Sequence, residues 1–396
     1  MRKIYRFAAL TLIAFTLLAA AGCGKKKAET VTLYAWGGDD RTNAYISDVL
    51  APYVLDTTGV ELKHVKMDAA DFLVKLSNET KAGTKSDIDL LWINGENFYS
   101  AKENGLLYGP FTDKVENLSK YVDQSAALTD FGYETKGYEA PWGKAQFVLF
   151  YDSAKVSDAP GNAEELKAFV KANPGTFTYP VASDFTASAF IRTLLYELVG
   201  FEKLNGLTND YNTVKEAIKP VIDYLNEIEP YLWKEGKTYP SDSTQLEGLY
   251  RDGEILFAMD YSANKALSMV SSGLWPKTTR TLVFEKGTPF NTHFLAIAGI
   301  SAHKEAAVKV INAALSPEMQ IKKADLTGWA DLPVLDYSKL SDADKAALDK
   351  AMTPESAYEK NLLTYSELDL HKQPELKADL VDVIEQIWSD SVLNDR

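Results

Sequence analysis

Short apolar runs that alternate with amphipathic stretches restrict the fold of this chain more than any other feature of its sequence. Each run has the length of a buried strand, and several of them end at a glycine or an asparagine, which are typical turn residues. The expected strands of the first part are residues 31–36, 61–65 and 88–93, and the expected helices are 40–55, 69–81 and 96–104. Strands separated by helices predict an α/β fold with a mostly parallel sheet flanked by helices.

The same alternation continues toward the C-terminus. Glu165 follows Asn162 by three residues, a capping-box spacing that predicts a helix start, and Pro317 after Ser316 predicts another. Further expected strands are 146–151, 177–181, 255–259, 281–284 and 293–300, and further expected helices include 187–199 and 214–231. An amphipathic helix ends the chain, with an apolar stripe at Leu376, Leu380, Ile384 and Ile387.

The composition excludes several classes of protein. Apolar residues make up 46% of the chain and charged residues 25%, which is typical of a globular protein with a core. The formal net charge of −14 argues against nucleic acid or anionic lipid as the main partner. With one cysteine and four scattered histidines, the sequence offers no disulfide framework and no clustered metal ligands, so we expect no cofactor and no metal.

Residues 1–22 have the layout of a secretory signal peptide, with a cationic start, an uncharged apolar stretch and small residues before Cys23. The small residues and the cysteine resemble a bacterial lipobox, although Ala20 stands where leucine is commoner. We therefore expect an acylated Cys23 as the mature N-terminus, followed by a polar tether over residues 23–30. No other segment is long and apolar enough to span a membrane, so we expect an exported, lipid-anchored protein.

Catalytic motifs are missing from the sequence. It contains no GxGxxG, HExxH or GxSxG motif and no complete phosphate-binding loop. Two Ser-x-x-Lys matches, at Ser262 and Ser301, lack the other motifs of penicillin-interacting enzymes. We expect no enzymatic activity, and an exported hydrolase remains a remote alternative. A purely structural or adhesive lipoprotein is a further alternative, which the absence of any solute-induced thermal shift would favour.

The tryptophans suggest where a ligand binds. Trp36 and Trp92 stand at or near the carboxyl ends of expected strands, the edge at which open α/β sheets bind ligands, and Trp142 lies between proline and glycine. Aromatic faces beside carboxylates suit an organic cation or a flat heteroaromatic ring. For any one tryptophan, a place in the core beside a loop is the better explanation, whereas Trp36, Trp92 and Trp142 taken together favour a site.

Charged and amide side chains follow these tryptophans and one later strand. Asp39 and Glu96 come soon after Trp36 and Trp92, and Asp260 ends the strand 255–259. Asp184 precedes an expected helix. For Asp184 and Glu96 the alternative is a carboxylate that only stabilises a helix N-terminus.

Several segments of the chain resemble the solute-binding protein of an ABC importer. The more closely similar subfamily is the one labelled as thiamine-transport substrate-binding proteins. The segments that carry the resemblance are the lipobox, residues 90–98 (LLWINGENF), 141–146 (PWGKAQ), 175–180 (GTFTYP), 291–294 (NTHF) and 315–320 (LSPEMQ).

The resemblance implies a two-lobed periplasmic-binding-protein-like fold, each lobe a mostly parallel sheet with helices, with the ligand in the cleft between the lobes. Lobe one would comprise 31–145 and 292–335, and lobe two 150–287, with strands crossing near 146–151 and 288–294. Residues 336–396 would form helices that pack on lobe one. The partners would be a small solute and the transmembrane subunits of an ABC permease, and we expect a monomer.

The resemblance implies thiamine, a phosphorylated relative or another cationic or heteroaromatic solute as the ligand. A polyamine, an anion or ferric iron are the alternatives, although the chain lacks the adjacent tyrosines common in iron-binding relatives. The expected ligand-binding residues are Trp36, Gly37, Gly38, Asp39, Trp92, Asn94, Glu96, Asn97, Trp142, Gln146, Tyr179, Asp184, Trp233, Asp260, Tyr261, Asn291 and His293.

Overall fold

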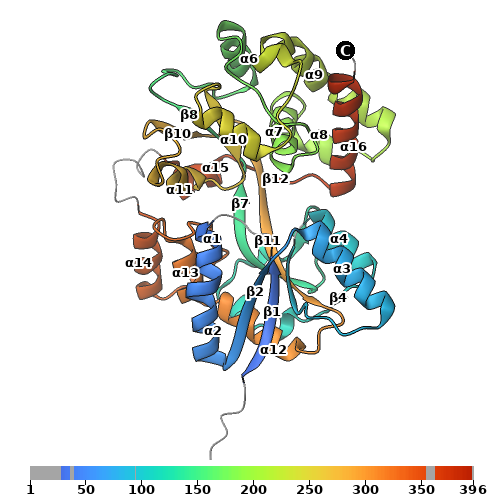
Figure 1. Cartoon of the computed structure of the whole chain (residues 1–396), viewed down its shortest axis with the longest axis vertical. Coiled ribbons are helices and arrows are strands. Elements are labelled where there is room, and N and C mark those ends of the chain that lie inside the picture. The colour runs from blue at the N-terminus through green and yellow to red at the C-terminus, as the bar shows by residue number, and fades with distance from the viewer. Residues whose placement is uncertain (1–27, 36–39, 94, 354–361, 395–396) are drawn as a thin grey trace, which may run out of the picture.

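The computed structural model describes residues 28–35, 40–93, 95–353 and 362–394. Figure 1 shows two bodies, one above the other, with two long strands running between them. These strands are β7 (Glu139–Gln146) and β11 (Thr288–Ala298), which pair antiparallel. We call the body built on the larger sheet the first lobe and the other the second lobe.

The first lobe contains a seven-stranded sheet in which the order β12-β11-β3-β1-β2 forms the main path, with β4 and β7 also paired to β11. Strand β1 pairs parallel with both β2 and β3, as the sequence predicts, whereas β11 runs antiparallel to β3. Its other strands are β1 (Glu29–Ala35), β2 (Val60–Lys66), β3 (Leu90–Ile93), β4 (Leu107–Tyr108) and β12 (Lys372–Pro374).

Helices cover both faces of this sheet. Alternate residues of β1 serve opposite faces: Val31 and Leu33 belong to one apolar cluster and Tyr34 to another. Helices α2 and α12 pack on the first face, and α3 and α4 pack on the second. The helices of this lobe are α1 (Asp40–Ala44), a π-helical turn (Tyr45–Leu50), α2 (Ala51–Thr58), α3 (Ala69–Ala82), α4 (Gly95–Glu103), α5 (Glu116–Tyr121), α12 (Lys304–Ala314), α13 (Pro317–Ala324) and α14 (Asp342–Ala351).

The second lobe contains a three-stranded sheet in the order β10-β8-β9. Both neighbours of β8 run antiparallel to it, so the expectation of a mostly parallel sheet is wrong for this lobe. Alternation along the chain shows that helices separate the strands, but it does not fix the direction in which each strand returns. The elements are β8 (Val148–Asp152), β9 (Phe257–Asp260), β10 (Thr279–Leu282), α6 (Ala163–Ala172), α7 (Phe185–Leu198), α8 (Phe201–Asn205), α9 (Tyr211–Ile228), α10 (Ser243–Arg251) and α11 (Lys265–Ser271).

Two further strand predictions need correction. Residues 177–181 form no strand: the Phe177 carbonyl accepts from the N–H of Trp233, which begins a 3-10 helix (Trp233–Gly236), and the Val181 N–H donates to the Pro240 carbonyl in a loop. The expected strand 146–151 spans the end of β7 and most of β8, which meet at Phe147. A small hairpin of β5 (Thr129–Asp130) and β6 (Tyr133–Glu134) was not expected from the sequence.

The C-terminal helices divide between the lobes. Helix α14 packs against α13 of the first lobe. Helix α16 (Ala378–Trp388), however, packs against α9, and its apolar stripe joins the core of the second lobe, so the expectation that 336–396 packs on lobe one is wrong here. In Figure 1 the red helix α16 stands beside the second lobe. An apolar stripe shows that a helix is covered, but not by which neighbour.

A short segment connects α15 (Tyr365–Leu370) with α16 and crosses the junction of the lobes. We call this segment, residues 371–377, the strap. Its strand β12 pairs parallel with the start of β11. The His371 carbonyl accepts hydrogen bonds from the Thr288 backbone and from Gln146 Nε2 (2.9 Å). Within the described ranges, no helix is both long and apolar enough to cross a membrane.

Candidate functional site

A β-bulge in the crossing strands brings one tryptophan and one histidine together. The pairing of β7 with β11 shifts register between His293 and Phe294, which pair with Gly143 and Pro141, so Trp142 has no opposite residue. A Cβ atom on Gly143 would lie 2.0 Å from His293 Nε2 and 2.1 Å from Asp331 Oδ2. Only glycine therefore allows these side chains to approach the strand so closely.

Four rings meet at this bulge. We call Trp92, Trp142, His293 and Trp329 the tryptophan–histidine cluster. The Trp92 centroid lies 5.0 Å from those of Trp142 and His293, in edge-to-face arrangements, and the Trp329 ring lies parallel to His293 at 6.0 Å. Trp92 is 3% exposed and Trp142 0%, whereas Trp329 is only half-buried. Trp329 is therefore the tryptophan of the cluster that presents ring surface.

A buried lysine provides this cluster with its own cation. Lys323 Nζ lies 5.7 Å from the Trp142 ring centroid and 5.3 Å from that of Trp329. It lies 2.5 Å from Asp331 Oδ2, and the same oxygen lies 3.0 Å from His293 Nε2. Burial lowers the pKa of Lys323. Burial alone would raise the pKa of Asp331, but the charges of His293 and Lys323 outweigh it and lower that pKa.

A second polar cluster lies where the strap meets the second lobe. We call Arg192, Tyr261, Asn291 and Glu375 the arginine–glutamate cluster. Arg192 Nε lies 3.1 Å from Glu375 Oε2, and Arg192 Nη2 donates to the Tyr261 hydroxyl at 2.8 Å. That hydroxyl donates to Glu375 Oε1 at 2.5 Å, and Asn291 Nδ2 donates to the same oxygen at 3.3 Å. These groups are buried and tie α7, β11 and the strap together.

The carboxylates expected from the second lobe are already occupied by bonds within the protein. Asp184 is the N-cap of α7 and accepts the backbone N–H groups of Thr186 and Ala187 at 3.0 Å. This geometry favours the helix-start interpretation of Asp184. Asp260 accepts from Lys265 Nζ at 2.8 Å, and Lys265 also pairs with Glu247. Asp260 is thus paired with Lys265, and it shares that lysine with a second carboxyl group, Glu247.

Two other expected residues lie within the second lobe. Tyr179 is 0% exposed and its hydroxyl accepts from Trp388 Nε1 at 3.2 Å, so its assignment as a ligand contact is wrong for this conformation. Trp233 donates to Glu254 at 3.0 Å, and it contacts neither cluster in the described residues. An aromatic residue next to a turn can complete a core as readily as it can line a site.

The remaining expected residues are placed unevenly. Gln146 is buried and holds the strap through His371, and Asn97 lies half-buried on α4. Residues 36–39 (Trp36, Gly37, Gly38 and Asp39), Asn94, the side chain of Glu96 and Cys23 lie outside the described part of the chain. Residues that the sequence reasoning missed are Trp329, Lys323, Asp331, Arg192 and Glu375. One signal was available, because Arg192 is a single cation in an otherwise apolar helical segment.

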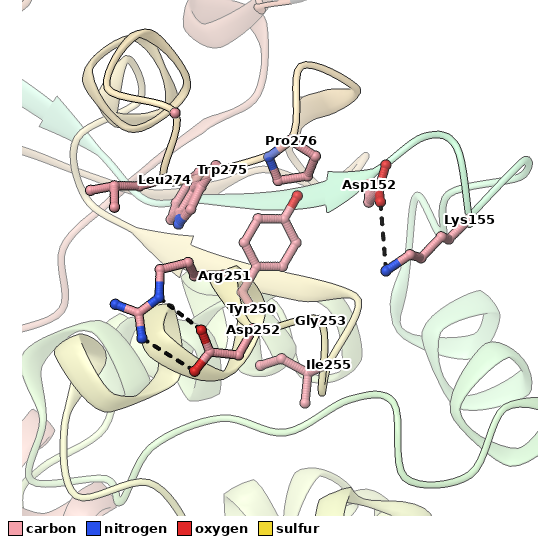
Figure 2. Close-up of a pocket in the computed structure, with 11 residues that line it drawn as sticks. Asp152, Lys155, Tyr250, Arg251, Asp252, Gly253, Ile255, Leu274, Trp275 and Pro276 are labelled. Carbon is pink, nitrogen blue, oxygen red and sulfur yellow. Dashed lines mark hydrogen bonds and ion pairs between the residues drawn. The ribbon is translucent and has the colours of Figure 1, made fainter.

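Two cavities are found elsewhere in the structure. The first, of about 380 Å³, lies in the second lobe between α10, β8 and the segment after α11. Figure 2 shows that ion pairs border it, Arg251 with Asp252 on one side and Asp152 with Lys155 on the other. The second, of about 320 Å³, lies in the first lobe between α2, α5 and α12. Neither is lined by the two clusters.

Comparison with known proteins places the chain in a family. Residues 49–354 match the family model described as bacterial extracellular solute-binding protein. The Escherichia coli (strain K12) protein named Protein YnjB is 36% identical over 331 residues, which cover 82% of this chain and 84% of that protein.

Solved structures of low identity share the fold. A Clostridium perfringens structure described as an ABC transporter has a TM-score of 0.64 at 18% identity, covering 92% of this chain and 99% of that one. The spermidine/putrescine ABC transporter substrate-binding protein PotD of Streptococcus pneumoniae has a TM-score of 0.61 at 16% identity, covering 91% and 98%. Iron-bound HitA of Pseudomonas aeruginosa has a TM-score of 0.59 at 19% identity, covering 92% and 99%. With its two-lobed α/β fold and its match over most of its length, the chain belongs to the bacterial extracellular solute-binding protein family.

Proposed function

We propose that this protein is the exported receptor of an ABC importer and that it captures a flat, cationic heteroaromatic solute such as thiamine or a phosphorylated relative. The observation that carries the proposal is the half-buried ring of Trp329, held parallel to His293 in the tryptophan–histidine cluster. A tryptophan face offers both stacking surface for a flat ring and attraction for a positive charge. The family assignment supports the role of receptor, and the likeness to thiamine-transport proteins supports the solute.

In this proposal Trp92, Trp142 and His293 act mainly by fixing Trp329, because Trp92 and Trp142 are almost fully buried around it. Residues 36–39 and 94–97 stay predicted ligand contacts on the sequence alone, because they follow two strands and open α/β sheets bind ligands beyond the carboxyl ends of their strands. The solute would lie between the lobes, and closure of the lobes would exclude water from it.

A polyamine is the second candidate, and one observation favours it. Among the described residues, Glu247 and Asp260 both pair with Lys265, so two carboxyl groups meet one ammonium group at the end of β9. Burial raises the pKa of Glu247, and a bound ammonium group would offset that effect. A polyamine would need such carboxylates more than it would need a stacking surface.

The wider biology follows from the sequence. We infer that residues 1–22 are removed, that Cys23 is lipidated and that residues 23–30 tether the domain to the outer face of the cell membrane. We infer lobe boundaries of 31–145 with 292–335 and of 150–287, and the permease of the importer would receive the solute. We assign no enzymatic activity, and we expect the receptor to act as a monomer.

A thermal-shift screen with thiamine, thiamine phosphate, spermidine and inorganic phosphate tests the proposal. A probe at 100 times its dissociation constant should stabilise the folded chain by about 2.7 kcal/mol. Trp329→Ala should weaken binding of the best probe by about 1–3 kcal/mol. Trp233→Ala, a tryptophan outside both clusters, is the matched control and should leave affinity unchanged. A thermal shift with spermidine but not with thiamine would favour the second candidate. Normal binding by Trp329→Ala would refute the role of Trp329 as the stacking surface for the solute.

A further inference from the structure

Two carboxyl groups are buried beside the first lobe's edge, outside both clusters. Asp130, at the end of β5, is 2% exposed, and Glu139, at the start of β7, is 0% exposed. Asp130 Oδ2 accepts the backbone N–H of Gly95 at 2.5 Å. Among the described residues, neither oxygen of Glu139 has a hydrogen-bond partner. An ionised carboxylate without a partner is very costly to bury, so the geometry favours a protonated Glu139.

The surroundings of Asp130 and Glu139 also favour the protonated form of these carboxyl groups. Burial raises the pKa of Asp130 and of Glu139, and the charge of Asp130 raises the pKa of Glu139 further. Glu375 of the strap adds to the effect on Asp130, whereas Lys102 of α4 partly opposes it at Glu139. Other charged groups of the elements packed here are Glu134 on β6, Lys377 on the strap and Asp379 on α16.

Asp130 is placed to control how α4 and the second lobe meet. Gly95, which it holds, is the first residue of α4 and follows the β3 edge of the proposed site closely. Phe131, which follows Asp130 in the chain, has a φ of 42°. Its ring packs against Gly95, because a Cβ atom added to Gly95 would lie 3.1 Å from the Phe131 ring. The Phe131 ring also lies 6.3 Å from Phe185 of the second lobe, and Phe185 stacks on Tyr261 at 4.6 Å.

We propose that Asp130 is a positioning residue for solute binding, and that Glu139 carries the proton that allows these two carboxyl groups to be buried together. Loss of that proton places a second negative charge beside Asp130. Repulsion between the two buried carboxylates then destabilises the arrangement in which Asp130 holds Gly95, so the binding-competent arrangement is lost as pH rises. The effect on solute affinity rests on the proposed function, but the proton on Glu139 does not.

The first test is urea unfolding of the mature chain between pH 5 and 9 at constant ionic strength. The folded state retains a proton on Glu139, whereas the unfolded state releases it near the ordinary glutamate pKa of about 4.3. The free energy of unfolding therefore falls as pH rises above that value. One retained proton changes the folding equilibrium constant by about tenfold per pH unit. Glu139→Gln should remove that part of the slope. Glu103→Gln, an exposed glutamate at the end of α4, is the control and should keep the wild-type slope.

A second measurement keeps the proposal testable if Glu139→Gln does not fold. In the wild-type chain labelled with ¹³C at the glutamate carboxyls, the assigned Glu139 resonance should titrate at a clearly higher pH than that of the exposed Glu103. Titration of Glu139 in the same pH range as Glu103, or an unchanged pH dependence of stability in folded Glu139→Gln, would overturn the proposal. Affinity for the best screening probe should fall with pH in wild type and much less in Glu139→Gln. If no probe binds while Glu139 is found protonated, the proposed function fails and the proton on Glu139 stands.

Discussion

Replacing Gly143 by alanine tests whether the bulge in β7 fixes the tryptophan–histidine cluster. The new Cβ would lie 2.0 Å from His293 Nε2, 2.1 Å from Asp331 Oδ2 and 2.5 Å from Lys323 Nζ. Since ordinary contacts lie at about 3.5–4.0 Å, the nearest of these groups must move by about 1.5 Å. Lys323 is fully buried and cannot swing into solvent.

The magnitude follows from two effects. Overpacking alone costs about 1–3 kcal/mol, and separation of a buried ion pair costs about 3–5 kcal/mol. Because the Lys323–Asp331 pair should be strained rather than fully broken, we expect Gly143→Ala to lower the free energy of unfolding by about 2–5 kcal/mol.

Urea unfolding followed by tryptophan fluorescence measures this loss. Gly206→Ala is the matched control, because the nearest atom to its added Cβ lies at an ordinary 3.6 Å. The control should change stability by less than about 0.5 kcal/mol. If both variants lie within that range at an unchanged m-value, the close approach at Gly143 does not constrain the cluster and our reasoning is wrong.

Three other changes give sharp expectations. Glu375→Gln should lower the free energy of unfolding by about 3–5 kcal/mol, because it leaves the buried Arg192 charge uncompensated. The double variant with Arg192→Met should recover part of that loss in a double-mutant cycle. Additive losses would contradict the pairing of the two residues. Asp184→Ala should remove a helix cap at a cost of about 1 kcal/mol in thermal or urea unfolding. It should not change the affinity for the best screening probe, and a loss of affinity would return Asp184 to the site. Cys23→Ser should abolish metabolic labelling with palmitate and release the folded protein from membranes, whereas unchanged fractionation would refute lipidation.

Local sequence patterns determined most of the secondary structure of the first lobe. The apolar runs before Gly37 and Gly95 correspond to β1 and β3, and the helical stretch over 69–81 corresponds to α3. These elements could be predicted because a buried strand or an amphipathic helix has a repeat that is visible within a few residues. The cap of α7 by Asp184 was likewise one of two interpretations available from the sequence.

Tertiary structure alone decided the strand directions of the second lobe, the partner of α16 and the fate of the charged groups. Asp260 looked available to a solute, yet Lys265 contacts it. Lys323, Asp331 and His293 are unremarkable in the sequence and meet only because the bulge at Trp142 and the bare backbone of Gly143 allow it. The physical reason is the separation along the chain of the residues involved. Hydrophobic periodicity is set by residues a few positions apart, whereas the pairing of a buried charge depends on which distant segment the fold brings within a few ångströms.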